Sequence, residues 1–117
     1  MIEAACHCGA VRLSAPSAPD TVTECNCSIC RRLGARWAYY SPKQVRITEA
    51  EPTDTYIWGD RDLTLHRCSD CGCVTHWHAT DPTYDRMGVS ARLLAPEILA
   101  VARVIQFDGA SMGSPTF

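Results

Sequence analysis

The chain has 117 residues, of which 46% are hydrophobic and 21% are charged, and its formal net charge is −2 at pH 7. This length and composition predict one globular domain over residues 1–117 with a modest core. The acidic balance argues against a nucleic-acid-binding protein, which needs a basic face to neutralise phosphates.

No segment predicts export or membrane insertion. The start, MIEAACHCGA, has neither the basic region nor the apolar stretch of a signal peptide. The apolar run LLAPEILAVARVI is too short and too interrupted to cross a membrane. We therefore expect a cytoplasmic protein with no nucleic-acid partner and no membrane partner, and the sequence does not indicate an oligomeric state.

Short strands separated by turn residues are predicted along the chain. They cover Ala10–Ser14, Thr21–Cys25, Arg36–Tyr40, Val45–Thr48, Thr55–Trp58, Leu63–Arg67, Val74–His78 and Val104–Phe107. The predicted fold class is mostly β, with metal ions substituting for part of a small core.

Two short helices are also predicted. The first is Ser28–Leu33, with Ser28 as a candidate N-cap and Gly34 as the residue that ends it. The second is Pro96–Val101, with Pro96 at the first helical position.

Eight cysteines are a high number for such a chain. Without an export signal the thiols are expected to stay reduced, so metal binding or catalysis is favoured over disulfides. The cysteines fall into three groups. These are Cys6 and Cys8; Cys25, Cys27 and Cys30; and Cys68, Cys71 and Cys73.

Two of the groups have the form of a zinc knuckle. In CHCG at 6–9 and CSDCG at 68–72 a glycine follows the ligand pair, and its backbone can fold over a metal and point N–H groups at the sulfurs. Together Cys6, Cys8, Cys68 and Cys71 would form a closed, structural Cys₄ site. The spacing alone also permits other quartets.

The middle group, CNCSIC at 25–30, has no such glycine. Three thiolates on a tetrahedral zinc leave one coordination position open, as a catalytic or ligand-binding zinc requires. The alternative is a second structural zinc whose fourth ligand is Cys73 or a histidine.

Arg31 and Arg32 follow this group directly. They are candidates to clamp an anionic ligand beside the metal. The alternative is that both are solvated residues on the face of a helix.

Other candidates are weaker. Cys73 is expected to be a small buried apolar residue, and strand alternation places it with Trp77 on one face and Val74 with His76 and His78 on the other. His76 and His78 are half-exposed strand residues in one interpretation and proton shuttles in another.

The remaining histidines and aromatic residues have simpler expected roles. His7 is expected to be a turn residue, and His66 is a candidate to orient a ligand. Trp37, Tyr39 and Tyr40 are expected in the core or in the wall of a pocket.

Five segments in order resemble the glutathione-dependent formaldehyde-activating enzyme and centromere protein V family. They are CHCGAVR at 6–12, CNCSICRRLGA at 25–35, WAYYSP at 37–42, YIWGD at 56–60 and HRCSDCGC at 66–73. The resemblance spans about residues 2–107. It implies a zinc-stapled β-tent of twisted antiparallel sheets and two Zn²⁺ ions per chain. One zinc would be structural, on Cys6, Cys8, Cys68 and Cys71, and one of catalytic type, on Cys25, Cys27 and Cys30.

The resemblance also implies a carbon–sulfur lyase activity that interconverts S-(hydroxymethyl)glutathione with glutathione and formaldehyde. The leading functional prediction is therefore a zinc-dependent lyase-like protein acting on a thiol adduct, with a small thiol such as glutathione as partner. The alternative is a non-catalytic zinc module that binds a thiol or a protein.

Overall fold

The computed structural model describes residues 1–50 and 52–112, so residues 51 and 113–117 of the predicted domain lie outside the described part. The chain forms a smaller sheet of order β1–β2–β5 and a larger one of order β10–β3–β4–β9–β8–β7–β6. The smaller sheet contains β1 (Ile2–Ala5), β2 (Val11–Ala15) and β5 (Arg46–Glu49). The larger contains β3 (Thr21–Cys25), β4 (Trp37–Tyr40), β6 (Asp54–Ile57), β7 (Leu63–Arg67), β8 (Val74–Ala79), β9 (Met87–Ser90) and β10 (Arg103–Phe107).

The predicted mostly-β class is confirmed. All strand pairs are antiparallel except β3 with β10, whose parallel pairing makes the larger sheet mixed. The two helices are α1 (Ser28–Leu33) and α2 (Pro96–Val101). Short 3₁₀ segments cover η1 (Pro42–Gln44), η2 (Ala91–Leu93) and η3 (Gly109–Ser111). No helix in the described ranges is long and apolar enough to span a bilayer.

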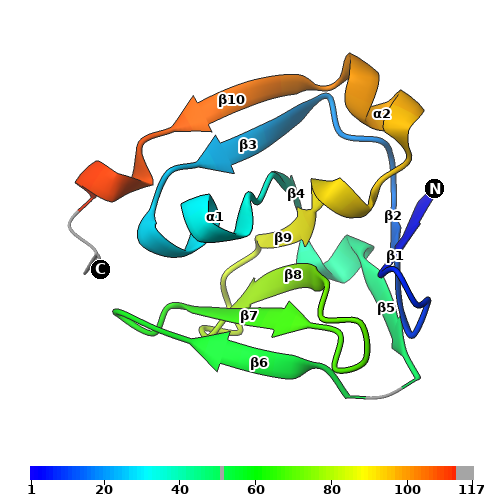
Figure 1. Cartoon of the computed structure of the whole chain (residues 1–117), viewed down its shortest axis with the longest axis horizontal. Helices are drawn as coiled ribbons and strands as arrows, with labels where there is room; N and C mark the ends of the chain where they lie inside the picture. Colours follow the sequence, from blue (N-terminus) through cyan, green and yellow to red (C-terminus); the bar gives the residue numbers. More distant parts are fainter. Residues whose placement is uncertain (51, 113–117) are drawn as a thin grey trace.

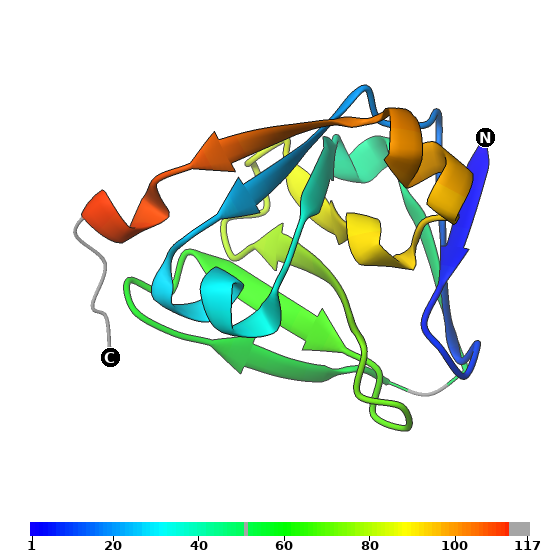
Figure 2. The same cartoon turned by 45° about the horizontal axis from the view of Figure 1, so that its top comes forward.

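The larger sheet is strongly splayed. In Figures 1 and 2 its β3–β10 end and its β6–β7 end spread apart, and α1 lies between them. The smaller sheet stands at one end of the molecule, and η3 and the β6–β7 turn lie at the other. This arrangement brings α1, η3 and the β6–β7 turn to the same region.

Helix α1 has the predicted bounds, but its N-cap lies one residue before the candidate Ser28. The N-cap is Cys27, in an extended conformation, and Ser28 is the first helical residue and is buried. The predicted end is confirmed, because Gly34 takes a left-handed conformation with φ of 64°. Helix α2 has the predicted bounds, with Pro96 at its start.

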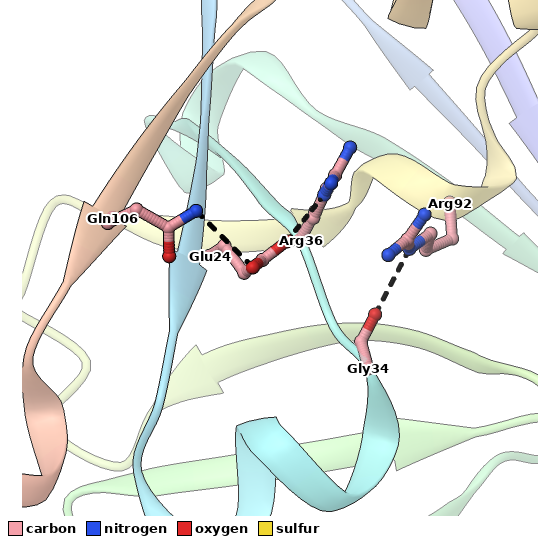
Figure 3. Close-up of polar contacts among 5 residues, drawn as sticks. All are labelled: Glu24, Gly34, Arg36, Arg92 and Gln106. Carbon is pink, nitrogen blue, oxygen red and sulfur yellow. Dashed lines mark hydrogen bonds and ion pairs between the residues drawn. The ribbon is translucent and has the colours of Figure 1, made fainter.

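Polar contacts fix the end of α1 and the neighbouring strands (Figure 3). The Arg92 Nε donates to the Gly34 carbonyl at 3.0 Å, which satisfies a carbonyl group at the helix C-terminus. Glu24 accepts from Arg36 at 2.8 Å and from Gln106 at 3.3 Å, and so joins β3 to β10 and to the segment before β4. Partly exposed ion pairs add little stability, so these contacts mainly set position.

Among the described residues, the core consists of three clusters of buried residues. One lies between the two sheets, around Val11, Leu13, Met87 and Val89, and includes Cys6 and Cys68. The second is centred on Val22, Ala38, Ala91 and Leu94. The third contains Ala35, Trp37, Leu65 and Trp77, with Cys30 packed against it.

A β-bulge in β8 makes the faces of this strand differ from the predicted alternation. The pairs His66–His76 and Arg67–Val74 leave Thr75 as the extra residue opposite β7. Val74 therefore packs with Trp77 rather than with His76, and Cys73 packs with the Cys6 cluster rather than on the Trp77 face.

Candidate metal centres and cavity

The first cysteine group joins the two sheets. Cys6 and Cys8 lie in the β1–β2 connection, Cys68 and Cys71 in the β7–β8 connection, and all four sulfurs lie within 4.8 Å of one another. The Sγ atoms of Cys6 and Cys8 are 3.7 Å apart, and those of Cys8 and Cys68 are 3.6 Å apart. A tetrahedral zinc with bonds of about 2.3 Å separates its sulfurs by about 3.8 Å, so this donor set fits zinc.

The knuckle geometry predicted for this group is present. Gly9 and Gly72 have φ of 82° and 78°, and their backbone N–H groups donate to the carbonyls of Cys6 and Cys68. The Val11 N–H donates to the Cys6 Sγ at 3.3 Å. Backbone hydrogen bonds from Cys73 and Cys8 lower the pKa of Cys71 to about 5. These donors favour the thiolate form that a metal ligand needs.

The second group has three ligands. Cys25 ends β3, Cys27 caps α1 and Cys30 lies within α1, and their sulfurs lie within 4.8 Å of one another. Within the described ranges, no further Cys, His, Asp or Glu side chain joins these three at that distance. Three thiolates of this kind fit a zinc with an open fourth position.

Hydrogen-bond donors also surround the second group. The Trp37 Nε1 donates to the Cys30 Sγ at 3.4 Å, and the Cys27 N–H donates to the Cys25 Sγ at 3.4 Å. Burial alone would raise the pKa of Cys27, but hydrogen bonds from the Cys30 backbone and from the neighbouring thiols outweigh it and lower that pKa. Burial raises the pKa of Cys30. A bound cation would hold all three as thiolates.

The segment around η3 packs directly on this group. A Cβ at Gly109 would lie 2.5 Å from the Cys25 Sγ and 3.1 Å from the Cys27 Cβ, so the backbone approaches where no side chain fits. Asn26 holds the segment in place. Its Nδ2 donates to Asp108 at 3.0 Å, and its Oδ1 accepts from the Ala110 N–H at 2.9 Å. The sequence motifs did not indicate this contact.

The second group opens on a cavity of about 640 Å³, called here the thiol cavity. Its lining includes Cys25 and Cys27 of this group and Gly109 and Met112 near the C-terminal end. The aromatic wall consists of Tyr39, Trp58, Trp77, Tyr84 and Phe107. The prediction that Tyr39 lies in a pocket wall is thus confirmed. The core, which was the other predicted location, contains Trp37 beside Cys30. Tyr40 packs against two buried clusters and donates its hydroxyl to the Ser17 carbonyl.

Most charged groups in the thiol cavity lie outside the segments that carry the family resemblance, although Asp60 ends the YIWGD segment. Its described lining includes Asp60, Asp62 and Asp81 and one guanidinium, that of Arg86. The Arg86 guanidinium lies 4.0 Å from the Tyr39 ring centroid, a cation–π contact. Hydrogen bonds from the side chain and backbone of Thr83 hold the pKa of Asp81 below its usual value.

Arg31 and Arg32 do not line the thiol cavity. Both are exposed on α1, and Arg32 donates to the Ser28 carbonyl at 2.9 Å. Their role as an anion clamp remains a prediction, and Arg86 is the guanidinium in the described lining of the thiol cavity.

Cys73 lies with the first group and not with the second. It packs against the cluster of Cys6 and Cys68, and its sulfur accepts a hydrogen bond from the His7 backbone. The alternative in which Cys73 completes the second zinc site is therefore not supported.

The other three histidines, His66, His76 and His78, gather on the face of β7 and β8 that is opposite the thiol cavity.

Comparison with known proteins gives a family match and shows similarity to solved structures. The family model described as glutathione-dependent formaldehyde-activating enzyme matches residues 1–101. The chain belongs to the glutathione-dependent formaldehyde-activating enzyme family. The match includes all eight cysteines, and so both metal groups, but stops before β10 and η3.

One similar solved structure is a crystal structure of a Rhodobacter sphaeroides protein from a structural genomics programme. It is 27% identical, it aligns over 89% of this chain and 100% of its own, and the TM-score is 0.72. The fold of this family member is thus shared with a solved protein over nearly the whole chain.

Proposed function

We propose that this family member is a zinc-dependent carbon–sulfur lyase-like enzyme that acts on a thiol adduct, of the S-(hydroxymethyl)glutathione synthase type. The observation that carries the proposal is the second cysteine group. Its three sulfurs converge beside a cavity, and no fourth protein ligand lies among them in residues 1–50 and 52–112. Family membership supports the same chemistry.

The two cysteine groups have different roles in this proposal. Cys6, Cys8, Cys68 and Cys71 hold a structural zinc, because four thiolates close its coordination shell. Cys25, Cys27 and Cys30 hold a zinc of catalytic type. When bound there, zinc supplies an open position that accepts a substrate sulfur and favours its thiolate form.

The residues of the thiol cavity bind and orient the substrate. Glutathione carries carboxylates and one ammonium group. Arg86 can bind a carboxylate, and Asp60, Asp62 or Asp81 can bind the ammonium. Tyr39, Trp58 and Trp77 supply an apolar wall that limits water around the reacting sulfur.

Cleavage of the adduct is balanced without any further reactant. In HOCH₂–SG the carbon–sulfur bond breaks and its electron pair stays on sulfur, while the hydroxyl proton leaves and the carbon becomes formaldehyde. The aspartates of the thiol cavity or water can accept that proton. The reverse reaction joins a glutathione thiolate to formaldehyde.

Exchange NMR on glutathione and formaldehyde at equilibrium tests the proposal. The wild-type chain should accelerate adduct formation and cleavage, and Cys27→Ser should return the exchange to the uncatalysed rate. Cys73→Ala is the matched control, because Cys73 belongs to neither proposed ligand set. Equal exchange with wild type and Cys27→Ser would contradict the proposal and favour the non-catalytic zinc module.

A further inference from the structure

Three of the four histidines form a third cluster of ligand-type side chains, called here the histidine cluster. It consists of His66 from β7 and of His76 and His78 from β8, and one ring nitrogen of each lies within 4.8 Å of the others. The cluster is separate from both cysteine groups, although His66 is two residues from Cys68. None of the three residues lines the thiol cavity.

The register of the sheet explains why the rings converge. His66 and His76 are direct cross-strand partners, and His78 is two residues further along β8, on the same face. The rings of His66 and His76 are stacked, with centroids 4.2 Å apart and planes 9° from parallel. Opposite this face, Leu65 and Trp77 pack in the core, so the backbone under the cluster is held rigidly.

The contacts of Thr75 fit a tautomer of His76 whose Nε2 can bind a metal. The Thr75 hydroxyl donates to the His66 carbonyl at 3.5 Å and lies 2.9 Å from the His76 Nδ1. In the tautomer in which the hydroxyl proton is directed at that carbonyl, the His76 Nδ1 is the donor of this pair. The unprotonated nitrogen of His76 is then Nε2, which is available as a metal ligand.

His66 also has a threonine at its Nδ1, and its Nε2 faces His78. The His66 Nδ1 lies 2.7 Å from the Thr53 Oγ1, and its Nε2 lies 2.7 Å from the His78 Nδ1. A threonine on Nδ1 is the kind of outer partner that orients a metal-binding imidazole. His78 is exposed, and its ring proton can lie on Nδ1 or on Nε2. When it lies on Nε2, the Nε2 of His66 and the Nδ1 of His78 both present lone pairs, and a cation can take the place of the proton between them.

We propose that His66, His76 and His78 form a third metal site, for a divalent transition-metal cation of the zinc class. The ligand atoms would be Nε2 of His66, Nε2 of His76 and Nδ1 of His78. Imidazole nitrogens suit zinc, copper and nickel. His76 is 3% exposed and His78 lies at the surface, so the cation would enter from the side of His78 and keep a position for water there.

This site would differ chemically from the two cysteine groups. Three neutral imidazoles leave the full charge of a divalent cation, whereas three thiolates on zinc leave −1. Neutral nitrogen ligands also bind zinc more weakly than a thiolate set. The third cation should therefore exchange readily, while the cysteine-bound metals stay in place.

Zinc titration by calorimetry, on the folded chain without a polyhistidine tag, tests the site. The starting protein carries zinc on its cysteine groups, and wild type should take up one further equivalent, to about three per chain. His78→Ala should lose that uptake. His7→Ala should keep it, because it removes an exposed histidine outside the cluster.

Imidazole ¹⁵N NMR of wild type gives a second measurement that does not depend on any variant. Zinc should shift Nε2 of His66 and His76 and Nδ1 of His78, and leave His7 unchanged. No uptake by wild type, or equal uptake by wild type and His78→Ala with unshifted ring nitrogens, would overturn the proposal.

Discussion

Gly109 shows how a single residue can limit a metal site from outside the motif that forms it. It lies in the C-terminal 3₁₀ segment, far along the chain from CNCSIC, yet its backbone packs against Cys25 and Cys27. At this position the absence of a side chain matters for space, because an added Cβ would meet a ligand sulfur. The arrangement of the second cysteine group thus depends on residues that carry no metal-binding pattern.

We expect Gly109→Ala to weaken metal binding at the second group and to leave the first group loaded. The added methyl would stand 2.5 Å from the Cys25 Sγ, so either η3 or Cys25 must move. Metal content and the rate of zinc release to a chelator measure this. Ala110→Ser, on the exposed neighbouring residue, is the control. Wild-type zinc content and release from Gly109→Ala would show that the contact has no effect on the site.

Arg86 is the residue whose substitution should change the affinity for an anionic thiol. It lies in the thiol cavity over Tyr39, whereas Arg31 and Arg32 lie on α1 outside the lining. Arg86→Met should weaken binding of an anionic thiol roughly three- to tenfold and barely change binding of a neutral thiol of similar size. The Arg31→Met/Arg32→Met double variant should bind both thiols as wild type does. The opposite pattern would return the anion clamp to α1.

At the level of elements, the two cysteine groups are placed differently. The first joins the β1–β2 connection to the β7–β8 connection, so it links the two sheets across the core. The second lies within the continuous segment β3–α1, and β3 is already hydrogen-bonded to β10 on one side and to β4 on the other. Loss of the first should therefore release more structure than loss of the second.

We expect Cys71→Ser to unfold the chain and Cys27→Ser to leave most of the sheet intact. Structural zinc contributes on the order of 10 kcal/mol to small zinc domains, as much as the whole stability of many proteins. Thermal melts with metal analysis on both variants measure the difference. If Cys27→Ser collapses as completely as Cys71→Ser, both metals are structural and the lyase proposal loses its basis.

At the level of the whole molecule, local patterns were predictable and long-range contacts were not. Helices α1 and α2 and strands β3 and β7 have the bounds that capping residues and alternation predicted. Strands β1 and β9 were missed, because IEAA and MGVS have little β-branched or aromatic content and form strands through pairing.

The two cysteine groups were predictable because their patterns are local in the sequence. Ligand pairs and the closing glycines are local in sequence, so the sequence alone could indicate Cys6, Cys8, Cys68 and Cys71 as one candidate ligand set. The thiol cavity was not predictable, because Asp60, Arg86 and Gly109 come from three separate segments. The bulge at Thr75 likewise depends on pairing with β7, and it reversed the faces expected for Cys73 and Val74.

The central claim is that the second cysteine group binds a thiol from outside the chain as its fourth ligand. Cobalt-substituted protein measures this directly, because sulfur-to-cobalt charge-transfer bands respond to each added thiolate. Cobalt on the histidine cluster would contribute no such band, and the Cys27→Ser variant gives the background from the first group.

Titration with glutathione and with a small thiol should strengthen these bands in wild type and saturate. The apparent affinity should rise with pH, since the incoming thiol must lose its proton to coordinate. Bands that stay unchanged at high concentrations of both thiols would contradict the claim, and the chain would then be a β module held by two closed metal sites.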